Sequence, residues 1–201
     1  MKLLAPAFYN RKNVLIIAKE LLGKIIVTCV DGDVTSARIV EVEAYNGEGD
    51  RASHAFGGRR TKRTEVMYGS GGNAYVYLCY GIHHLFNVVT NAQDIPHAIL
   101  VRGAEPLKGV SVMLQRTKKF KQDHSLTRGP GNVSKALGIY TAMTGSSLQG
   151  DIIAIYEDGK RYKNEEIGIT PRIGVDYAGD DALLPYRFFV KGSPYVSGPK
   201  Q

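Results

Sequence analysis

The spacing of apolar side chains predicts an N-terminal helix followed by a β-hairpin. Apolar residues recur at helical spacing over 15–22, and Gly23 stands where a C-terminal cap would fall. Residues 24–30 are rich in β-branched side chains, and 31–33 (Asp-Gly-Asp) form a turn signal. Residues 34–45 then have the pattern of a long strand, which we expect to pair with the strand before it.

The alternation along this long strand places two carboxylates and a tyrosine on one face. Glu41, Glu43 and Tyr45 are two residues apart, so their side chains project to the same side near the end of the strand. One interpretation is that Glu41 and Glu43 are merely solvated on a wet face. The other is that this face carries chemistry.

The next part of the chain predicts a long loop and a hairpin. Residues 46–73 form a Gly-rich, basic connection, and its length favours a functional loop over a structureless one. Residues 74–80 and 85–90 are predicted strands, joined by 81–84. Tyr80 lies at the tip of this apolar and aromatic hairpin.

The second half of the chain predicts two helices and three short strands, with no internal repeat and no linker. The helices are expected from Glu105-Pro106 to about Lys118, and from the Gly-rich segment 128–132 to Leu137. The strands are expected at 98–101, 151–156 and 183–190. The pattern as a whole predicts one α+β domain over residues 1–201, with mostly antiparallel strands.

The charge of the chain is concentrated in its middle. The 201 residues carry a net charge of +7, but residues 51–140 alone carry +9 and the two flanking parts carry −1 each. Six of the twelve tyrosines lie in or beside this middle part. A solvated basic face and a contact with a polyanion both fit the charge, and aromatic side chains among basic ones can stack on bases.

Several classes of protein are excluded by what the sequence lacks. There is no apolar run of membrane-spanning length and no signal-peptide pattern, and Cys29 and Cys79 form no metal motif. We therefore expect a soluble, cytoplasmic protein whose two cysteines are small buried side chains. No Walker loop, GxGxxG, GxSxG, HExxH or CxxC motif occurs either.

With these motifs absent, the side chains left to carry out chemistry are carboxylates, histidines, tyrosines and arginines. Glu43 is a candidate general base for water, and His54 could line the same site or be a surface residue. Arg102 could hold an anion or simply pair with Glu105. A water-activating carboxylate in an aromatic pocket beside a basic surface suits hydrolysis of a glycosidic bond in nucleic acid. The base would first have to leave the stack, and Tyr80 is placed to fill the gap.

Six segments in chain order resemble the alkyladenine (3-methyladenine) DNA glycosylase family. The segments are RIVEVEAY (38–45) with Ser53-His54 and 57–59, YVYLCYGIHHLFNVV (75–89), ILVRGAEPL (99–107), RGPGNVSKALGI (128–139), PRIGVDYAG (171–179) and RFFVKGSPYVS (187–197). Each segment alone would be weak, but together they span nearly the whole chain.

The resemblance implies a monofunctional base-excision repair enzyme. Its substrate would be double-stranded DNA that contains damaged purines, of the 3-methyladenine, 7-methylguanine, hypoxanthine and ethenoadenine class. The fold would be one α+β domain with a curved, mainly antiparallel sheet, surrounding helices and a protruding hairpin that enters DNA. The resemblance implies no metal, no cofactor, no obligate protein partner and a monomer.

The resemblance also implies the residues of the reaction. Glu43 would activate the water that attacks the deoxyribose C1′, and Arg102 would help to hold that water. The backbone carbonyl of Ile173 would complete the water site. The absence of a lysine at the matched pocket positions agrees with water as the nucleophile.

Further residues are matched to base recognition and DNA contact. Tyr45, His54 and Tyr77 would sandwich the extruded base, and Asn87 would disfavour the 2-amino group of normal guanine. Tyr80 would intercalate through the minor groove. Contacts with DNA are expected from Arg59, Gly81, Ile82 and Gly174, whereas His83 and His84 match variable positions.

Two other functions remain open from the residues alone. A non-catalytic nucleic-acid-binding module would use the same basic segment and tyrosines but would leave no abasic sites. A carbohydrate-acting hydrolase would use Glu41 and Glu43, about 7 Å apart by strand rise, as an acid and base pair. A neutral sugar substrate would leave the net charge of +9 on residues 51–140 unexplained.

Overall fold

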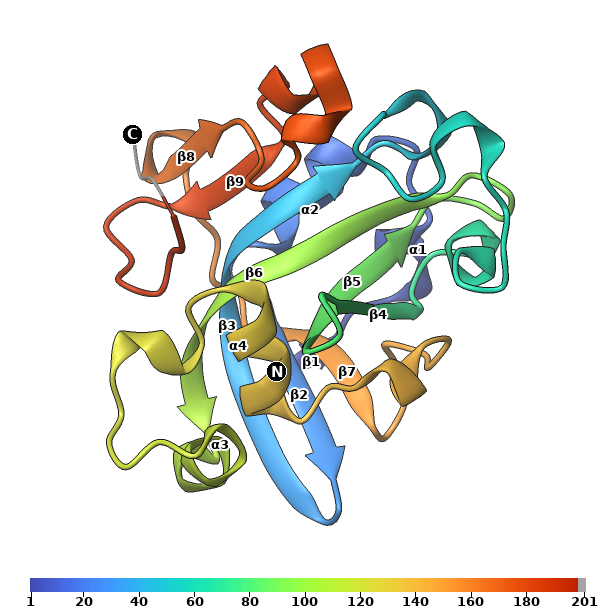
Figure 1. Ribbon diagram of the computed structural model, residues 1–201. Coiled ribbons are helices and arrows are strands. Elements are labelled where there is room, and N and C mark those ends of the chain that lie inside the picture. The colour runs from blue at the N-terminus through green and yellow to red at the C-terminus, as the bar shows by residue number, and fades with distance from the viewer. Residues whose placement is uncertain (199–201) are drawn as a thin grey trace.

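A strongly curved antiparallel sheet forms the centre of the molecule (Figure 1). The computed structural model describes residues 1–198, and within them nine strands pair in the order β1-β7-β2-β3-β6-β5-β4, with β9 joining β3 to β8. The strands are β1 (Lys2–Leu3), β2 (Ile25–Val30), β3 (Asp33–Tyr45), β4 (Ala74–Cys79), β5 (His83–Thr90), β6 (His97–Lys108), β7 (Ile153–Glu157), β8 (Ile167–Thr170) and β9 (Arg187–Val190).

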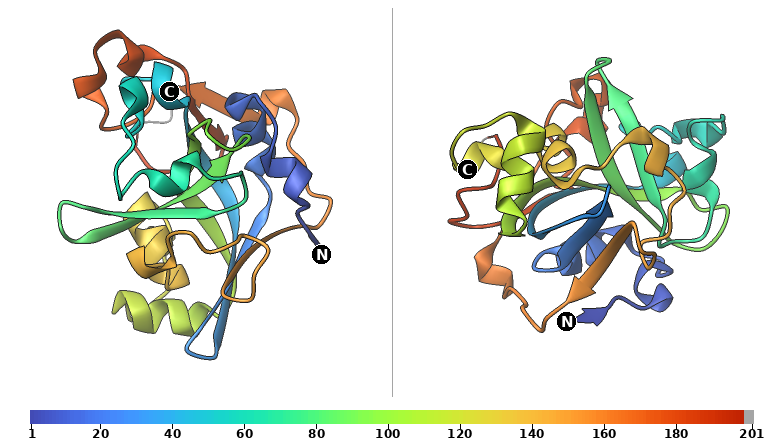
Figure 2. Two further views of the ribbon diagram at one scale, coloured as in Figure 1. Left: turned by 90° about the vertical axis from the view of Figure 1, so that its right-hand side faces the viewer. Right: turned by 90° about the horizontal axis from the view of Figure 1, so that it is seen from below.

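Helices cover both faces of this sheet. The α-helices are α1 (Pro6–Tyr9), α2 (Val14–Leu21), α3 (Val110–Thr117) and α4 (Pro130–Leu137). In Figure 1, α4 lies in front of the strands and α2 behind them, and the turned view in Figure 2 agrees. The predicted α+β class, the antiparallel sheet and the surrounding helices are thus confirmed.

The longest strand, β3, organises the fold and leads to the candidate site. One edge of β3 pairs with β6 along its length, while the other edge pairs first with β2 and then with β9. Its register against β6 shifts at three points between Ser36 and Val42. Such bulges bend a strand and increase its twist. The end of β3 contacts the segments that follow β8 and β9, through hydrogen bonds of Glu43 with Ile173 and of Glu41 with Ser197.

Local sequence signals account for the first elements. The Asn13 side chain caps α2 by accepting hydrogen bonds from the amides of Leu15 and Ile16. The buried face of α2 is the predicted apolar one, and Gly23, at φ +88°, turns the chain into β2. Asp31 and Gly32 both have positive φ, as a tight hairpin turn between β2 and β3 requires.

The β4–β5 hairpin projects from the body of the molecule (Figure 2, left). Strand β5 begins at His83, so the loop is shorter than the predicted 81–84. The turn at Tyr80 and Gly81 is held by a hydrogen bond from the Ile82 amide to the Cys79 carbonyl, 3.1 Å long. The predicted protruding hairpin is confirmed.

The helix predicted from Glu105-Pro106 to about Lys118 is present as α3, but its predicted start is wrong. Strand β6 continues through both residues to Lys108, and α3 begins only at Val110. Proline near an apolar helical pattern suggested a helix start, but pairing with β3 outweighs that local preference. Pro106 is tolerated because it lies beside one of the register shifts.

Other differences are smaller. The strand expected at 183–190 is limited to β9, because a 3₁₀ helix over 176–183 takes in its first residue and 184–186 belong to no strand. The sequence pattern gave no signal for β1, α1 or β8. Cys29 is exposed and Cys79 partly exposed, so the expectation that both are buried is also wrong.

Candidate active site

The carboxylate of Glu43 lies at the centre of the candidate site. Glu43 is near the end of β3 and has no exposed surface. Its Oε1 accepts a hydrogen bond from the Ile173 amide at 2.7 Å. Its Oε2 accepts from the Tyr45 hydroxyl at 3.0 Å and from Arg102 Nη1 at 3.3 Å. Three separate parts of the chain thus donate to one carboxylate: β3, β6 and the loop after β8.

The surroundings of Glu43 raise its pKa overall, because burial outweighs the groups that favour its ionised form. Burial raises the pKa of Glu43, while Arg102, the Ile173 amide and the Tyr45 hydroxyl act in the opposite direction. Burial also raises the pKa of Tyr45 well above its usual value, so its hydroxyl keeps the proton that it donates. A desolvated carboxylate held by donors is suited to accepting a proton from water.

Ile173 meets Glu43 through a different group from the one expected. The sequence resemblance assigns the Ile173 carbonyl to the water site, whereas the contact seen here is made by its N–H. The role of the carbonyl stays a prediction. Gly174, at φ +75°, follows and gives the loop a backbone conformation that a larger side chain rarely adopts.

A cavity lined by aromatic side chains lies next to this carboxylate. It is small, with a volume of about 30 Å³. Its lining consists of Tyr45, Ala52, Ser53, His54, Met67, Tyr75, Tyr77, Asn87 and Tyr177. All four predicted pocket residues are therefore brought together, while Met67, Tyr75 and Tyr177 are additions. Tyr45 links the two parts of the site, because its hydroxyl contacts Glu43 and its side chain lines the cavity.

The side chains within the cavity are held by specific contacts. His54 Nδ1 hydrogen-bonds the Tyr75 hydroxyl at 2.7 Å. The rings of His54 and Tyr77 meet edge to face, with centroids 4.6 Å apart. Asn87 Nδ2 donates to the backbone carbonyls of Tyr75 and Leu85 at 3.1 and 3.2 Å. Because both donors of the amide are engaged, the Asn87 side chain cannot rotate freely.

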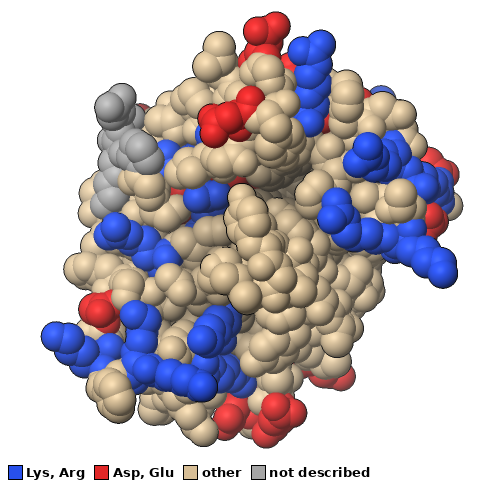
Figure 3. Space-filling model, viewed as in Figure 1, with Lys and Arg blue, Asp and Glu red and all other residues tan. Residues whose placement is uncertain are grey.

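The residues predicted to contact DNA lie on the surface. Tyr80 is 92% exposed and has φ +51°, an uncommon conformation for a residue other than glycine, and Ile82 is 71% exposed. Lys and Arg side chains gather in two groups on the face from which the hairpin projects (Figure 3). One group lies over the loop that includes Arg59, and the other over α3 and the loop after it.

Sequence reasoning missed a buried ion pair behind the cavity. Asp50 and Arg172 form two hydrogen bonds, of 2.5 and 2.8 Å, and their side chains are almost fully buried. Arg172 also donates to the Ala44 carbonyl, and its guanidinium lies over the Tyr45 ring at 4.9 Å. Arg172 directly precedes Ile173. The pair therefore ties the loop after β3 to the loop that contacts Glu43.

Comparison with known proteins identifies the family. Residues 7–194 match the family model described as methylpurine-DNA glycosylase. The chain belongs to the methylpurine-DNA glycosylase family. A protein of Desulfitobacterium hafniense (strain Y51) is 43% identical over 98% of this chain and 99% of its own length. A protein of Bacillus thuringiensis (strain Al Hakam) is 45% identical over 96% of this chain and 97% of its own length. Both are named "Putative 3-methyladenine DNA glycosylase".

Membership of this family makes the protein a DNA glycosylase, a hydrolase that acts on DNA. The resemblance drawn from the six sequence segments is thereby confirmed. The alternatives of a non-catalytic binding module and a carbohydrate hydrolase are set aside. The idea that Glu41 and Glu43 are merely solvated is wrong, because both are fully buried and both contact Arg102.

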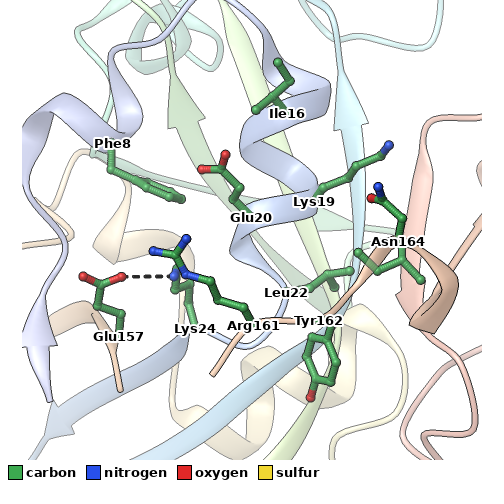
Figure 4. A pocket seen from close by; sticks show the side chains of 11 residues that line it. Phe8, Ile16, Lys19, Glu20, Leu22, Lys24, Glu157, Arg161, Tyr162 and Asn164 are labelled. Carbon is green, nitrogen blue, oxygen red and sulfur yellow. Dashed lines mark hydrogen bonds and ion pairs between the residues drawn. The ribbon is translucent and has the colours of Figure 1, made fainter. Parts of the chain in front are cut away.

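A larger cavity lies away from this site, between α2 and the segment 157–167 (Figure 4). It holds none of the predicted site residues, and both carboxylates that line it are paired. Lys24 contacts Glu157 at 3.1 Å, and Glu20 contacts Arg11 at 2.7 Å. Within residues 1–198, no helix is long and apolar enough to cross a membrane, and no cluster of His, Cys, Asp and Glu could hold a metal ion.

The buried position of His54 has a consequence for stability. Burial, followed by the positive charges of Arg63 and Arg59, lowers the pKa of His54 from 6.5 to about 4. The unfolded chain therefore takes up this proton at a higher pH than the folded protein does. Stability from this source is complete above the unfolded pKa and is lost as the pH falls through the range 6.5 to 4.

Replacing His54 with Gln is therefore expected to make the protein less sensitive to acid. Between pH 7 and pH 5, the free energy of unfolding of the wild type should fall by about 2 kcal/mol more than that of His54→Gln. Urea unfolding of both proteins at the two pH values measures this difference. His97, whose pKa is also lowered by burial, is present in both proteins and cancels. Equal losses in the two proteins would show that His54 is not held neutral.

Proposed function

We propose that this glycosylase turns damaged purines out of duplex DNA and hydrolyses the N-glycosidic bond with water activated by Glu43, leaving an abasic site. The substrates are alkylated or deaminated purines, of the 3-methyladenine, 7-methylguanine, hypoxanthine and ethenoadenine class. The observation that carries this proposal is a fully buried carboxylate with three hydrogen-bond donors, joined through Tyr45 to an aromatic cavity.

Water attack at C1′ requires a base and a way to stabilise positive charge on the sugar. Glu43 removes the proton from the water as the new C–O bond forms and the bond to the purine breaks. Its negative charge also stabilises the oxocarbenium-like sugar of the transition state. Arg102 and the Ile173 amide lower the pKa of Glu43 against the effect of its burial, and so favour the ionised form that both tasks need. In this proposal Arg102 and the Ile173 carbonyl hold the water.

The aromatic cavity suits a damaged purine better than a normal one. An alkylated purine such as 3-methyladenine is positively charged, so it leaves readily and is attracted to the faces of electron-rich rings. Tyr45, His54 and Tyr77 are the rings that take it. Asn87, fixed by its two backbone contacts, opposes the 2-amino group of guanine. Because the His54 and Tyr77 rings touch, a base enters between them only after they separate.

The surface fits a duplex held over the projecting hairpin. Tyr80 fills the gap in the base stack, with Gly81 and Ile82 beside it in the groove. The two groups of basic side chains in Figure 3 would lie along the phosphate backbones, with Arg59 in one of them. Gly174 contributes a backbone contact near the flipped nucleotide. In this proposal the enzyme works as a monomer, as one domain over residues 1–201, without a cofactor or an obligate protein partner.

A set of duplexes that each carry one lesion tests this function. The four lesions named above and undamaged DNA are incubated with purified enzyme, and the free base is measured by chromatography. We expect release of at least the 3-methylated purine and none from undamaged DNA. Tight DNA binding without release of any base from any duplex would contradict the proposal.

A further inference from the structure

Glu41 is a second buried carboxylate, and the proposed chemistry does not use it. It lies on β3 two residues before Glu43 and has no exposed surface. It pairs with Gly103 of β6 on one side and with Phe189 of β9 on the other. Burying a carboxylate is costly unless its oxygens are well supplied with donors. The groups that donate hydrogen bonds to the Glu41 carboxylate therefore indicate its role.

Three segments of the chain supply those donors. Oε1 of Glu41 accepts from Arg102 Nε at 3.2 Å, from Arg187 Nε at 2.8 Å and from the Ser197 hydroxyl at 3.0 Å. Oε2 accepts from the Ser197 amide at 2.6 Å. The donors come from β6, from β9 and from the segment after β9. Glu41 is thus the point at which these segments meet.

Each of the three nitrogens of the Arg102 guanidinium donates a hydrogen bond within the protein. Nε contacts Glu41, Nη1 contacts Glu43 at 3.3 Å, and Nη2 contacts the Ser197 hydroxyl at 3.3 Å. The guanidinium is planar and rigid, so fixing Nε fixes the directions of both Nη groups. Of these partners, only Glu43 belongs to the proposed reaction. Glu41 and Ser197 determine where Nη1 points.

The residue next to Arg102 leaves room for this arrangement. A Cβ on Gly103 would lie 2.5 Å from the Tyr195 carbonyl oxygen and 3.1 Å from Glu41 Oε2. Any side chain at this position would push away either the Glu41 carboxylate or the segment that carries Ser197. The close approach of three backbones around Arg102 therefore depends on glycine.

We propose that Glu41 is a positioning residue that orients Arg102 toward Glu43 and its water, with Ser197 supporting the same orientation. Arg187 balances the charge, so that two carboxylates and two guanidinium groups face one another in the buried cluster. The inference rests on the proposed roles of Glu43 and Arg102. It goes beyond them by assigning the orientation of Arg102 to a residue that touches neither substrate nor water.

A double-mutant cycle tests this role. Glu41→Gln keeps the shape of the side chain and one acceptor but loses the charge that anchors Nε. We expect single-turnover base release to fall about 10- to 100-fold, because small misplacements of a catalytic group have effects of this size. DNA affinity should stay unchanged. In an Arg102→Gln background, Glu41→Gln should cause no further loss of base release. If Glu41→Gln acted through a general structural defect, its loss would add to the loss caused by Arg102→Gln.

An NMR measurement on the free protein tests the orientation of Arg102 independently of base release. The Arg102 Nε–H signal, identified by its absence in Arg102→Gln, should exchange slowly with water in the wild type and faster in Glu41→Gln. Ser197→Ala removes a contact of Arg102 without unbalancing the buried charges, and it should change the exchange in the same direction. Asp158→Asn, which breaks the remote pair with Arg38, is the control and should change neither exchange nor base release.

The outcomes separate the two proposals. Unchanged base release and unchanged Arg102 Nε–H exchange in both Glu41→Gln and Ser197→Ala would overturn the role of Glu41 while leaving the proposed function intact. If the wild type released no base, the proposed function would fail. The exchange of the Arg102 Nε–H would then still decide whether Glu41 orients this side chain.

Discussion

Replacing Glu43 with Gln is expected to lower single-turnover base release by about 10²- to 10⁴-fold, the usual contribution of a general base. The amide has the same shape as the carboxylate but cannot accept a proton from water. It also carries no charge to stabilise the sugar. The rate is measured with enzyme in excess over a duplex that carries one lesion, so that product release does not limit it.

DNA affinity and folding should survive the Glu43→Gln substitution. Glu43 lies wholly inside the protein, so it makes no contact with the phosphate backbone. Its burial opposes ionisation, so a neutral side chain of the same size is tolerated in its place. Glu105→Gln changes an exposed glutamate of β6 in the same chemical way and should leave base release unchanged. Near-normal release by Glu43→Gln would remove Glu43 from the mechanism.

Replacing Asp50 with Ala is expected to lower the free energy of unfolding by about 3–5 kcal/mol, because it leaves Arg172 charged and buried without its partner. Asp50 also accepts hydrogen bonds from the amides of Asn46 and Ala52, which fix the loop after β3. The substitution should therefore loosen the wall of the cavity as well. Urea unfolding at pH 7 measures the change.

An exposed ion pair provides the comparison for Asp50. Glu20 contacts Arg11 at 2.7 Å, but the side chains of Arg11 and Glu20 are 37% and 47% exposed. Pairs of this kind contribute little, since water and salt screen them. Glu20→Ala should therefore unfold at nearly the same urea concentration as the wild type. If Asp50→Ala were equally stable, the buried pair would not be what anchors the cavity wall to the loop of Ile173.

Local patterns predicted those parts of the fold whose signals lie close together in the sequence. Helix α2 and the hairpin of β2 and β3 each follow from spacing, a cap or a turn. The start predicted for α3 at Glu105-Pro106 was wrong because these two residues pair with β3, more than sixty positions away. No local preference reports such a partner.

The candidate site divides in the same way. Motifs located Glu43, Arg102 and the cavity residues, because each lies in a segment that resembles the family. The environment of Glu41 and Glu43 could not be predicted, since alternation alone places them on a face that looks wet. Their burial depends on β9 and on the segment of Ser197, which fold back from the far end of the chain.

The pair of Asp50 and Arg172 was missed for a related reason. The two residues are 122 positions apart, and neither spacing nor composition links them. Charged residues are almost never fully buried without a partner, but a sequence does not show which ones are buried. Only the fold brings the loop after β3 against the loop after β8.

In the proposed reaction, water activated by Glu43 cleaves the bond between a damaged purine and its sugar. The most direct test counts the products of one turnover on a duplex with a single 3-methyladenine, in the presence of borohydride. We predict one free base for each abasic site, an unbroken strand and no protein trapped on the DNA. Protein covalently trapped on the sugar would mean an amine nucleophile, and saturated binding without free base would mean no glycosidic hydrolysis. Either result would contradict the claim.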